Sequence, residues 1–260
     1  MGVLNITPDS FSDGGEFYSI NKALIHVEEL INAGADIIDI GSQSTRPGAI
    51  EVGPEIEIKR LLPVLKEIRI LYPNIIISVD TFNSDVAYKA LENGANWIND
   101  ISGGRRDSSI LNVVSEFKCP FVITHSKGNS QNMNSLATYD DLISDVISSL
   151  NRLTENALIK NISRENIIWD PGLGFSKDTS QNIEILKNLN KFKESSFPIL
   201  LGASRKRFIG EILDEENPKN RDIGSLAVTS LCSQLNLHAV RVHNVKIHHE
   251  LLKVSDMINR

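Results

Sequence analysis

The sequence predicts a (β/α)8 TIM barrel built as a single domain over residues 1–260. Eight short apolar runs rich in Ile, Val and Leu recur along the chain, and most are followed by apolar residues at three- and four-residue spacing. The runs do not alternate strictly, which is typical of parallel strands covered on both faces. A length of 260 residues suits one barrel. A doubly wound open sheet with the same elements is the competing architecture.

The elements follow one another in a regular order. The expected strands are 2–6, 37–40, 75–79, 96–99, 120–124, 166–169, 198–202 and 239–243. Helical spacing between them is clearest in two sets of residues: Leu24, Val27, Leu30 and Ile31, and then Leu142, Ile143, Val146, Ile147 and Leu150. Residues 33–40 and 93–100 resemble each other, and each segment predicts a helix that ends near a Gly and leads into a strand.

Composition excludes several classes of protein. The chain has 27 Lys and Arg against 33 Asp and Glu, so its formal net charge is −6. It therefore has no excess of basic residues for non-specific binding of nucleic acid. No apolar run reaches the roughly 20 residues that span a bilayer, and no signal peptide is recognisable, so we expect no membrane partner. Cys119 and Cys232 stand apart without metal or disulfide spacing, which suits a cytoplasmic protein.

Polar side chains gather where the expected strands end, and in a barrel that end carries the active site. They are Asn5, residues 42–48, Asp80 with Thr81, Asn99 with Asp100, residues 170–172, residues 204–207, and Arg241 with His243. One such residue would mean little, whereas a ring of them predicts a binding site.

The charges in this ring predict the kind of ligand. Lys206 follows the seventh strand and Arg241 and His243 lie on the eighth, where barrels commonly bind phosphate. Arg46 adds a planar guanidinium that suits phosphate oxygens. Three further side chains can accept hydrogen bonds from a nitrogen heterocycle: Asp80, Asn99 and Asp170. We therefore expect a ligand with a donor-rich ring at one end and phosphate at the other.

Each of these residues also has a simpler explanation. Asp80 with Thr81 could cap the following helix, and residues 170–172 could form an ordinary turn. Lys206 and Arg207 could be solvated charges at a helix start, and a lone histidine such as His243 is more often structural than a ligand. No His, Cys and Glu set has zinc spacing, and no G-x-S-x-G motif predicts a nucleophilic serine.

Seven segments, taken together, resemble the dihydropteroate synthase family. They are MGVLNITPDSFSDGG at 1–15, STRPGA at 44–49, SVDT at 78–81, INDISG at 98–103, DPGLGF at 170–175, SRK at 204–206 and RVHNV at 241–245. They stand in the family's order and span almost the whole chain. The family fold is the (β/α)8 barrel, in agreement with the prediction from the elements.

The resemblance implies a reaction and a set of residues. The family joins 6-hydroxymethyl-7,8-dihydropterin pyrophosphate to para-aminobenzoate, which gives 7,8-dihydropteroate and pyrophosphate in folate biosynthesis. By resemblance, the pterin would be held by Asp80, Asn99, Asp170 and Lys206, of which Asp80 and Lys206 would be catalytic. Pyrophosphate would be bound by Thr45, Arg46, Arg241 and His243. Asn5 would help to bind Mg²⁺, Phe11 and Pro47 would wall the para-aminobenzoate pocket, and a homodimer is the family's expected assembly.

Three departures from the family pattern carry expectations of their own. Gln43 stands before Ser44 where many members have Glu, which removes one carboxylate. Residues 124–126 read Thr-His-Ser where many bacterial members have Met-His-Met, so this wall of the pterin pocket is more polar. Arg207 replaces a common Ser and could pair with the carboxylate of para-aminobenzoate. Alternatively, Arg207 could lie on the outer face of the following helix.

Two other functions compete with this interpretation. A pterin-binding methyltransferase of the same superfamily would share Asp80, Asn99 and Asp170, but it has no use for the SRK segment. An inactive relative that only binds pterins would not need the residues on the pyrophosphate side, such as Arg46 and Arg241.

Overall fold

The structure is a computed structural model, and it describes residues 1–6, 16–43 and 51–259. Eight parallel strands form the centre: β1 (Gly2–Asn5), β2 (Ile37–Gly41), β3 (Ile76–Asp80), β4 (Trp97–Asp100), β5 (Phe121–Thr124), β6 (Ile167–Asp170), β7 (Leu200–Leu201) and β8 (Ala239–Val240). Strands β1 to β6 pair in sequence order, and β7 pairs with β8. Bridges between Trp169 and Ile199 and between Gly2 and Val242 join the two sets into a ring. The predicted barrel is therefore confirmed, and the open sheet is excluded.

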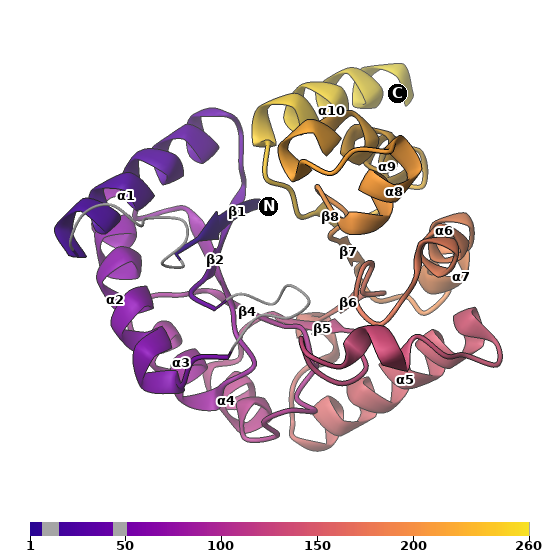
Figure 1. The fold of residues 1–260 in the computed structure, drawn as a ribbon. Helices are drawn as coiled ribbons and strands as arrows, with labels where there is room; N and C mark the ends of the chain where they lie inside the picture. Colours follow the sequence, from indigo (N-terminus) through magenta and orange to yellow (C-terminus); the bar gives the residue numbers. More distant parts are fainter. Residues whose placement is uncertain (7–15, 44–50, 260) are drawn as a thin grey trace.

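Helices surround this ring (Figure 1). They are α1 (Glu16–Asn32), α2 (Pro54–Leu71), α3 (Ser84–Glu92), α4 (Ile110–Phe117), α5 (Leu142–Ile159), α6 (Thr179–Lys187), α7 (Leu189–Lys193), α8 (Arg207–Leu213), α9 (Asp222–Gln234) and α10 (Val245–Asn259). Short 3₁₀ turns, η2 (Met133–Leu136), η3 (Arg164–Asn166) and η4 (Pro218–Arg221), lie between them. Within the described ranges, no helix is long and apolar enough to cross a membrane.

Local signals explain where several elements begin and end. Gly34 and Gly94 both adopt φ of +97°, a left-handed conformation that suits glycine at the end of a helix. The predicted resemblance between these two joints is thus confirmed. The cap of α3 is Asn83, whose side chain accepts a hydrogen bond from the Asp85 amide. The alternative that Asp80 and Thr81 cap this helix is therefore wrong, and the Asp80 side chain is free for another role.

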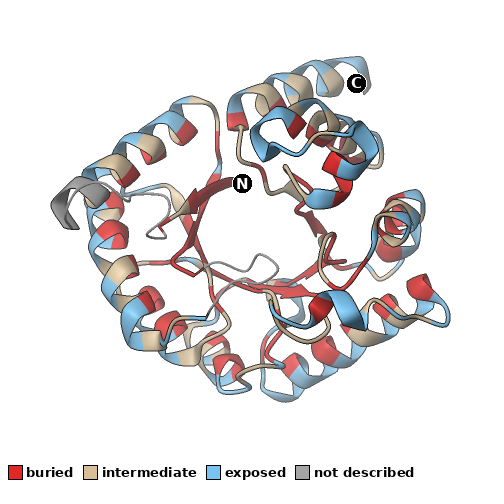
Figure 2. Cartoon of the chain, viewed as in Figure 1, coloured by how far each residue is buried: buried red, intermediate tan, exposed pale blue. Residues whose placement is uncertain are grey.

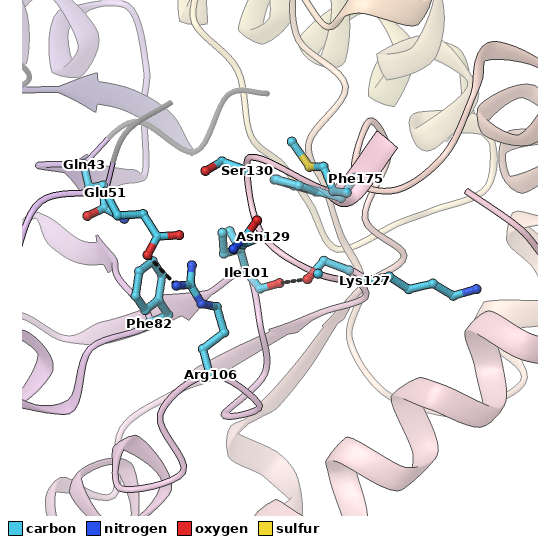
Figure 3. A pocket seen from close by; sticks show the side chains of 12 residues that line it. Gln43, Glu51, Phe82, Ile101, Arg106, Lys127, Asn129, Ser130 and Phe175 are labelled. Atoms are coloured by element: carbon cyan, nitrogen blue, oxygen red, sulfur yellow. Dashed lines mark hydrogen bonds and ion pairs between the residues drawn. The ribbon is translucent and has the colours of Figure 1, made fainter. Parts of the chain in front are cut away.

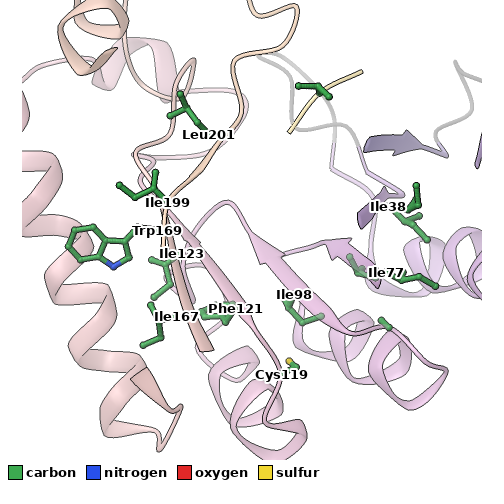
Figure 4. Close-up of a cluster of buried hydrophobic side chains, with 14 of the residues drawn as sticks. Ile38, Ile77, Ile98, Cys119, Phe121, Ile123, Ile167, Trp169, Ile199 and Leu201 are labelled. Atoms are coloured by element: carbon green, nitrogen blue, oxygen red, sulfur yellow. The ribbon is translucent and has the colours of Figure 1, made fainter. Parts of the chain in front are cut away.

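Two apolar layers stabilise the barrel, because successive strand residues point to opposite faces. The larger layer lies between the strands and the helices, and Figure 4 shows part of it, including Phe121 and Trp169. Figure 2 shows the same division, since most strand residues are buried while the outer faces of the helices are exposed. A smaller cluster fills the inside of the barrel: Met1, Ile37, Val122, Ile168 and Leu200. This inner cluster forms the floor beneath the polar residues described next.

Candidate active site

The alternation of strand residues places a ring of polar positions inside the barrel, above the apolar floor. The strand residues at or beside the apolar floor are Ile37, Ile76, Trp97, Val122, Ile168, Leu200 and Ala239. Residues two positions apart on a strand point to the same face, so the polar positions lie two or four residues further along the same strands. Five of these polar side chains are nearly or fully buried: Asp39, Ser78, Asn99, Thr124 and Asp170. The sequence therefore predicts correctly that Asp80, Asn99, Asp170 and Arg241 share one end of the barrel.

Arg241 is the centre of a network of charges inside the barrel. Its Nε donates to Asp39 Oδ2 at 2.6 Å and its Nη2 donates to Asp80 Oδ2 at 2.8 Å. Asn99 Nδ2 also donates to Asp39 Oδ2, at 3.2 Å. Asp39 is completely buried, and the sequence interpretation missed it. The signal was present, since an acidic residue inside an apolar strand needs a charged or hydrogen-bonding partner.

Burial raises the pKa of both predicted carboxyls. It raises the pKa of Asp80 to about 7; the Arg241 guanidinium opposes this shift and the Asp39 carboxylate adds to it. Burial also raises the pKa of Asp170, against the effect of the Lys206 ammonium. Displaced pKa values of this kind are common at functional sites.

Lys206 faces Asp170 from the loop between β7 and α8. A Cβ built at Gly202 would lie 3.8 Å from Lys206 Nζ and 3.9 Å from Asp170 Oδ2, so both groups border the space that this glycine leaves. Lys206 Nζ donates to the Leu173 carbonyl and lies 4.5 Å from the centre of the Phe175 ring. Burial lowers the pKa of Lys206 to about 8, although the Asp170 carboxylate opposes the shift.

The backbone before Lys206 is held by a second group of polar side chains. Arg205 adopts a φ of +59°, and its guanidinium binds both oxygens of Asp222 at 2.7 and 2.9 Å. Asn244 Nδ2 donates to the same carboxylate at 2.9 Å. His243 Nδ1 lies 3.0 Å from Ser204 Oγ, which ties the ends of β7 and β8 together. Sequence reasoning missed the role of Asp222.

Arg207 differs from its predicted neighbours because its side chain is 59% exposed. Its Nε lies 3.3 Å from Glu211 Oε1, one turn further along α8. This placement agrees with the alternative that Arg207 lies on the outer face of the helix. Such an exposed pair contributes only about 0.3–0.5 kcal/mol, so a substrate carboxylate could replace Glu211 at little cost.

A pocket opens beside this ring at the ends of β2 to β6, and Phe175 forms one of its walls (Figure 3). On the other side, the Arg106 guanidinium lies 3.8 Å from the centre of the Phe82 ring and pairs with Glu51 at 2.6 Å. Ser126, one of the departures from the family pattern, lines the pocket and donates to the Ile101 carbonyl at 2.6 Å. The pocket thus adjoins Lys206 through Phe175.

Another buried acid lies outside the barrel wall, near the ends of β2 and β3. Glu57 Oε2 lies 3.4 Å from Ser42 Oγ and 3.5 Å from Thr81 Oγ1. Burial raises the pKa of Glu57 to about 7, and the Asp80 charge adds to this shift. Gln43 Oε1 accepts from the Val52 amide at 3.0 Å. The predicted residues Phe11, Thr45, Arg46 and Pro47 lie outside the described residues.

The predicted metal ligand, Asn5, lies at the end of β1. A Cβ at Gly41 would stand 3.5 Å from Asn5 Oδ1 and 3.8 Å from Asp80 Oδ2, so the glycine leaves room between these two oxygens. Across the described part of the chain, no group of three or more His, Cys, Asp or Glu side chains is arranged to hold a metal ion. Oxygen donors and free space suit Mg²⁺, which takes few protein ligands and keeps water or phosphate oxygens.

Comparison with known proteins agrees with this geometry. The family model described as pterin-binding enzyme matches residues 1–243. The folic acid synthesis protein fol1 of Pneumocystis carinii is 46% identical over 99% of this chain, which spans 35% of that longer protein. The dihydropteroate synthase of Synechocystis is 42% identical, and the match covers 100% of this chain and 90% of the relative. The dihydropteroate synthase of Xanthomonas albilineans, solved with 4-aminobenzoic acid, superimposes with a TM-score of 0.93 at 36% identity, over 100% of this chain and 92% of that one.

The barrel, its buried ring of acids and bases and the family match define the class of protein: the chain belongs to the pterin-binding enzyme family. Its relatives of similar length narrow this class further. Within the family its place is among the dihydropteroate synthases, which are transferases of folate biosynthesis.

Proposed function

We propose that this chain condenses 6-hydroxymethyl-7,8-dihydropterin pyrophosphate with para-aminobenzoate to give 7,8-dihydropteroate and pyrophosphate. The observation that carries the proposal is the cluster of half-buried Asp80 with buried Asn99 and Asp170 beside two cations, Lys206 and Arg241. Carboxylate and amide oxygens accept the N–H groups of a pterin ring, and the cations suit its anionic pyrophosphate. A protein that only bound pterins would not need this second half of the site.

The pyrophosphate end is assigned to Arg241 and His243, together with Thr45 and Arg46. Arg241 has a guanidinium that reaches two acceptors at once, as a pyrophosphate requires. Asn5 would hold Mg²⁺ in the space beside Gly41. When bound, the ion would take up the negative charge that develops on the departing pyrophosphate.

The reaction needs no nucleophile from the protein. The bond between the pterin methylene carbon and the pyrophosphate oxygen breaks with both electrons on oxygen, and the carbon becomes cationic. Ionised Asp80, at the ring, would stabilise this charge, while Arg241 would stabilise the leaving group. The nitrogen of para-aminobenzoate then forms the new C–N bond and releases one proton. Positioning and charge therefore supply the catalysis.

The second substrate is assigned to the side of Lys206 that faces Phe175. Lys206 lies between the turn that carries Phe175 and the Asp170 carboxylate, so it can contact both substrates. Phe11 and Pro47 would complete the walls of this pocket. Arg207 would leave Glu211 to pair with the para-aminobenzoate carboxylate, since the exposed pair is weak.

Assembly and location are proposed from the family resemblance. We expect a homodimer, which light scattering of the purified protein would test. We also expect the protein in the cytoplasm, which fractionation of the source cells would test.

One assay tests the proposed function. Purified protein with the pterin pyrophosphate, para-aminobenzoate and Mg²⁺ should release pyrophosphate and form dihydropteroate, and omitting the arylamine should abolish the dihydropteroate. A methyltransferase would instead move a methyl group from a reduced folate to a corrinoid acceptor, and it would leave pyrophosphate untouched. Pterin binding without pyrophosphate release would show that the chain is a binding protein only.

A further inference from the structure

A buried lysine that the mechanism does not use, Lys177, lies behind the candidate active site. It is 3% exposed and follows the turn at residues 170–176. Its Nζ lies 2.9 Å from His125 Nδ1, 3.0 Å from the Gly172 carbonyl and 3.1 Å from the Phe175 carbonyl. An ammonium group has three N–H donors and no acceptor, so these three partners use all of them.

The partner on the barrel wall is a neutral histidine. Burial, followed by the charge of Lys177, lowers the pKa of His125 well below its ordinary value. Beside an ammonium donor, a neutral ring accepts at Nδ1 and carries its proton on Nε2. Because strand residues alternate, His125 points away from the inside of the barrel, where Thr124 points inward. Lys177 thus anchors the turn to β5 from the outside.

The turn is packed closely against this strand. Gly172 adopts a φ of +73°, and a Cβ at this position would lie only 1.9 Å from the His125 carbonyl oxygen. On the other side of the turn, the Leu173 carbonyl accepts from Lys206 Nζ, and the centre of the Phe175 ring lies 4.5 Å from the same Nζ atom. Lys177 therefore holds two carbonyls of the segment that contacts Lys206.

We propose that Lys177 is a positioning residue: through the Gly172 and Phe175 carbonyls it fixes the turn on which the Lys206 ammonium and the arylamine pocket depend. The inference rests on the proposed function, because it assigns an effect on the second substrate. The charged groups that face Lys177 are Asp170, Lys206 and Lys127. Burial lowers the pKa of Lys177 to about 7, and the Asp170 carboxylate opposes this shift.

Replacing Lys177 by Met tests the proposal, since Met keeps an unbranched apolar side chain and removes the three donors. Lys187→Met is the matched control, because Lys187 is an exposed lysine in the last turn of α6. We expect Lys177→Met to raise the KM for para-aminobenzoate at least about fivefold and to lower kcat about tenfold. The KM for the pterin pyrophosphate should change less than about twofold, and the control should match the parent protein.

Hydrogen exchange of the ligand-free proteins gives a readout that needs no activity. Peptides covering residues 170–178 should exchange faster in Lys177→Met than in the parent protein, while the control leaves them unchanged. If the parent protein releases no pyrophosphate, the proposed function fails, yet the exchange still decides whether Lys177 holds the turn. Should Lys177→Met not fold, Lys177→Gln is measured in the same way. Unchanged exchange, or equal increases in both KM values, would overturn the proposal.

Discussion

Replacing Asp39 by Asn tests the network of charges inside the barrel. Asp39 is completely buried and accepts from Arg241 Nε at 2.6 Å, while the Arg241 side chain is only 21% exposed. Removing one partner of a buried ion pair typically costs about 3–5 kcal/mol. Here Asp80 still contacts Arg241 Nη2 at 2.8 Å, so we expect Asp39→Asn to lower the free energy of unfolding by about 2–4 kcal/mol. For a chain of this size, the thermal midpoint should fall by roughly 5–15 °C.

Urea unfolding followed by circular dichroism measures this loss. Asp36→Asn is the matched control, because it makes the same change of charge at an exposed position three residues earlier; we expect it to stay within about 0.5 kcal/mol of the parent protein. Comparing Asp39→Asn, Arg241→Met and the double variant then gives the coupling energy between the two side chains, which we expect to be stabilising. The reasoning is refuted if Asp39→Asn and Asp36→Asn are equally stable.

Four further predictions concern the substrates, the metal and pH. Lys206→Ala should lower turnover about a hundredfold and leave the thermal midpoint nearly unchanged; unaltered kinetics would contradict its role. Arg207→Ser should raise the KM for para-aminobenzoate about five- to thirtyfold and spare that for the pterin. Equal KM values for the amine would instead show that Arg207 stays with Glu211. Calorimetry should detect no micromolar Mg²⁺ binding without pyrophosphate, because Asn5 is a neutral ligand. Glu57 has a pKa of about 7 in the folded chain against 4.5 ordinarily, so the folded state binds more protons and loses stability as pH rises from about 4.5 to 7. Glu57→Gln should therefore be up to about 3 kcal/mol more stable than the parent protein in urea unfolding at pH 8, with no such gain at pH 4.5.

The fold could be predicted from the sequence because its signals are local. Apolar runs, glycines at the ends of helices and polar residues at the ends of strands all lie within a few positions of one another. Strand lengths are less predictable: residues 198–202 and 239–243 were expected as strands, yet the ladder between them includes only Leu200–Leu201 and Ala239–Val240. The length of a strand depends on how many of its residues pair with the neighbouring strand. This pairing cannot be predicted from the residues of one strand alone.

The partners of the site residues could not be predicted, because they lie far apart in the chain. Arg241 and Asp39 are separated by 202 positions, and Lys177 and His125 by 52. No local pattern links such pairs, and each residue also has a plausible explanation by itself. What the sequence does contain is the anomaly of a charged residue in an apolar strand, as at Asp39, which predicts some partner without identifying it.

The contacts of Arg241 predict that binding of the pyrophosphate end and binding of the pterin ring are coupled. The Arg241 guanidinium donates to Asp80 Oδ2, an oxygen to which a pterin N–H would donate under the proposed function. A pyrophosphate that accepts the guanidinium would release this oxygen, while Asp39 keeps hold of Nε and limits how far the side chain moves. Under the proposed function, binding of the phosphate end would therefore make Asp80 available to the ring. It follows that a pterin alcohol without pyrophosphate should bind more weakly than its lost phosphate contacts alone would predict, because it must compete with Arg241 for Asp80.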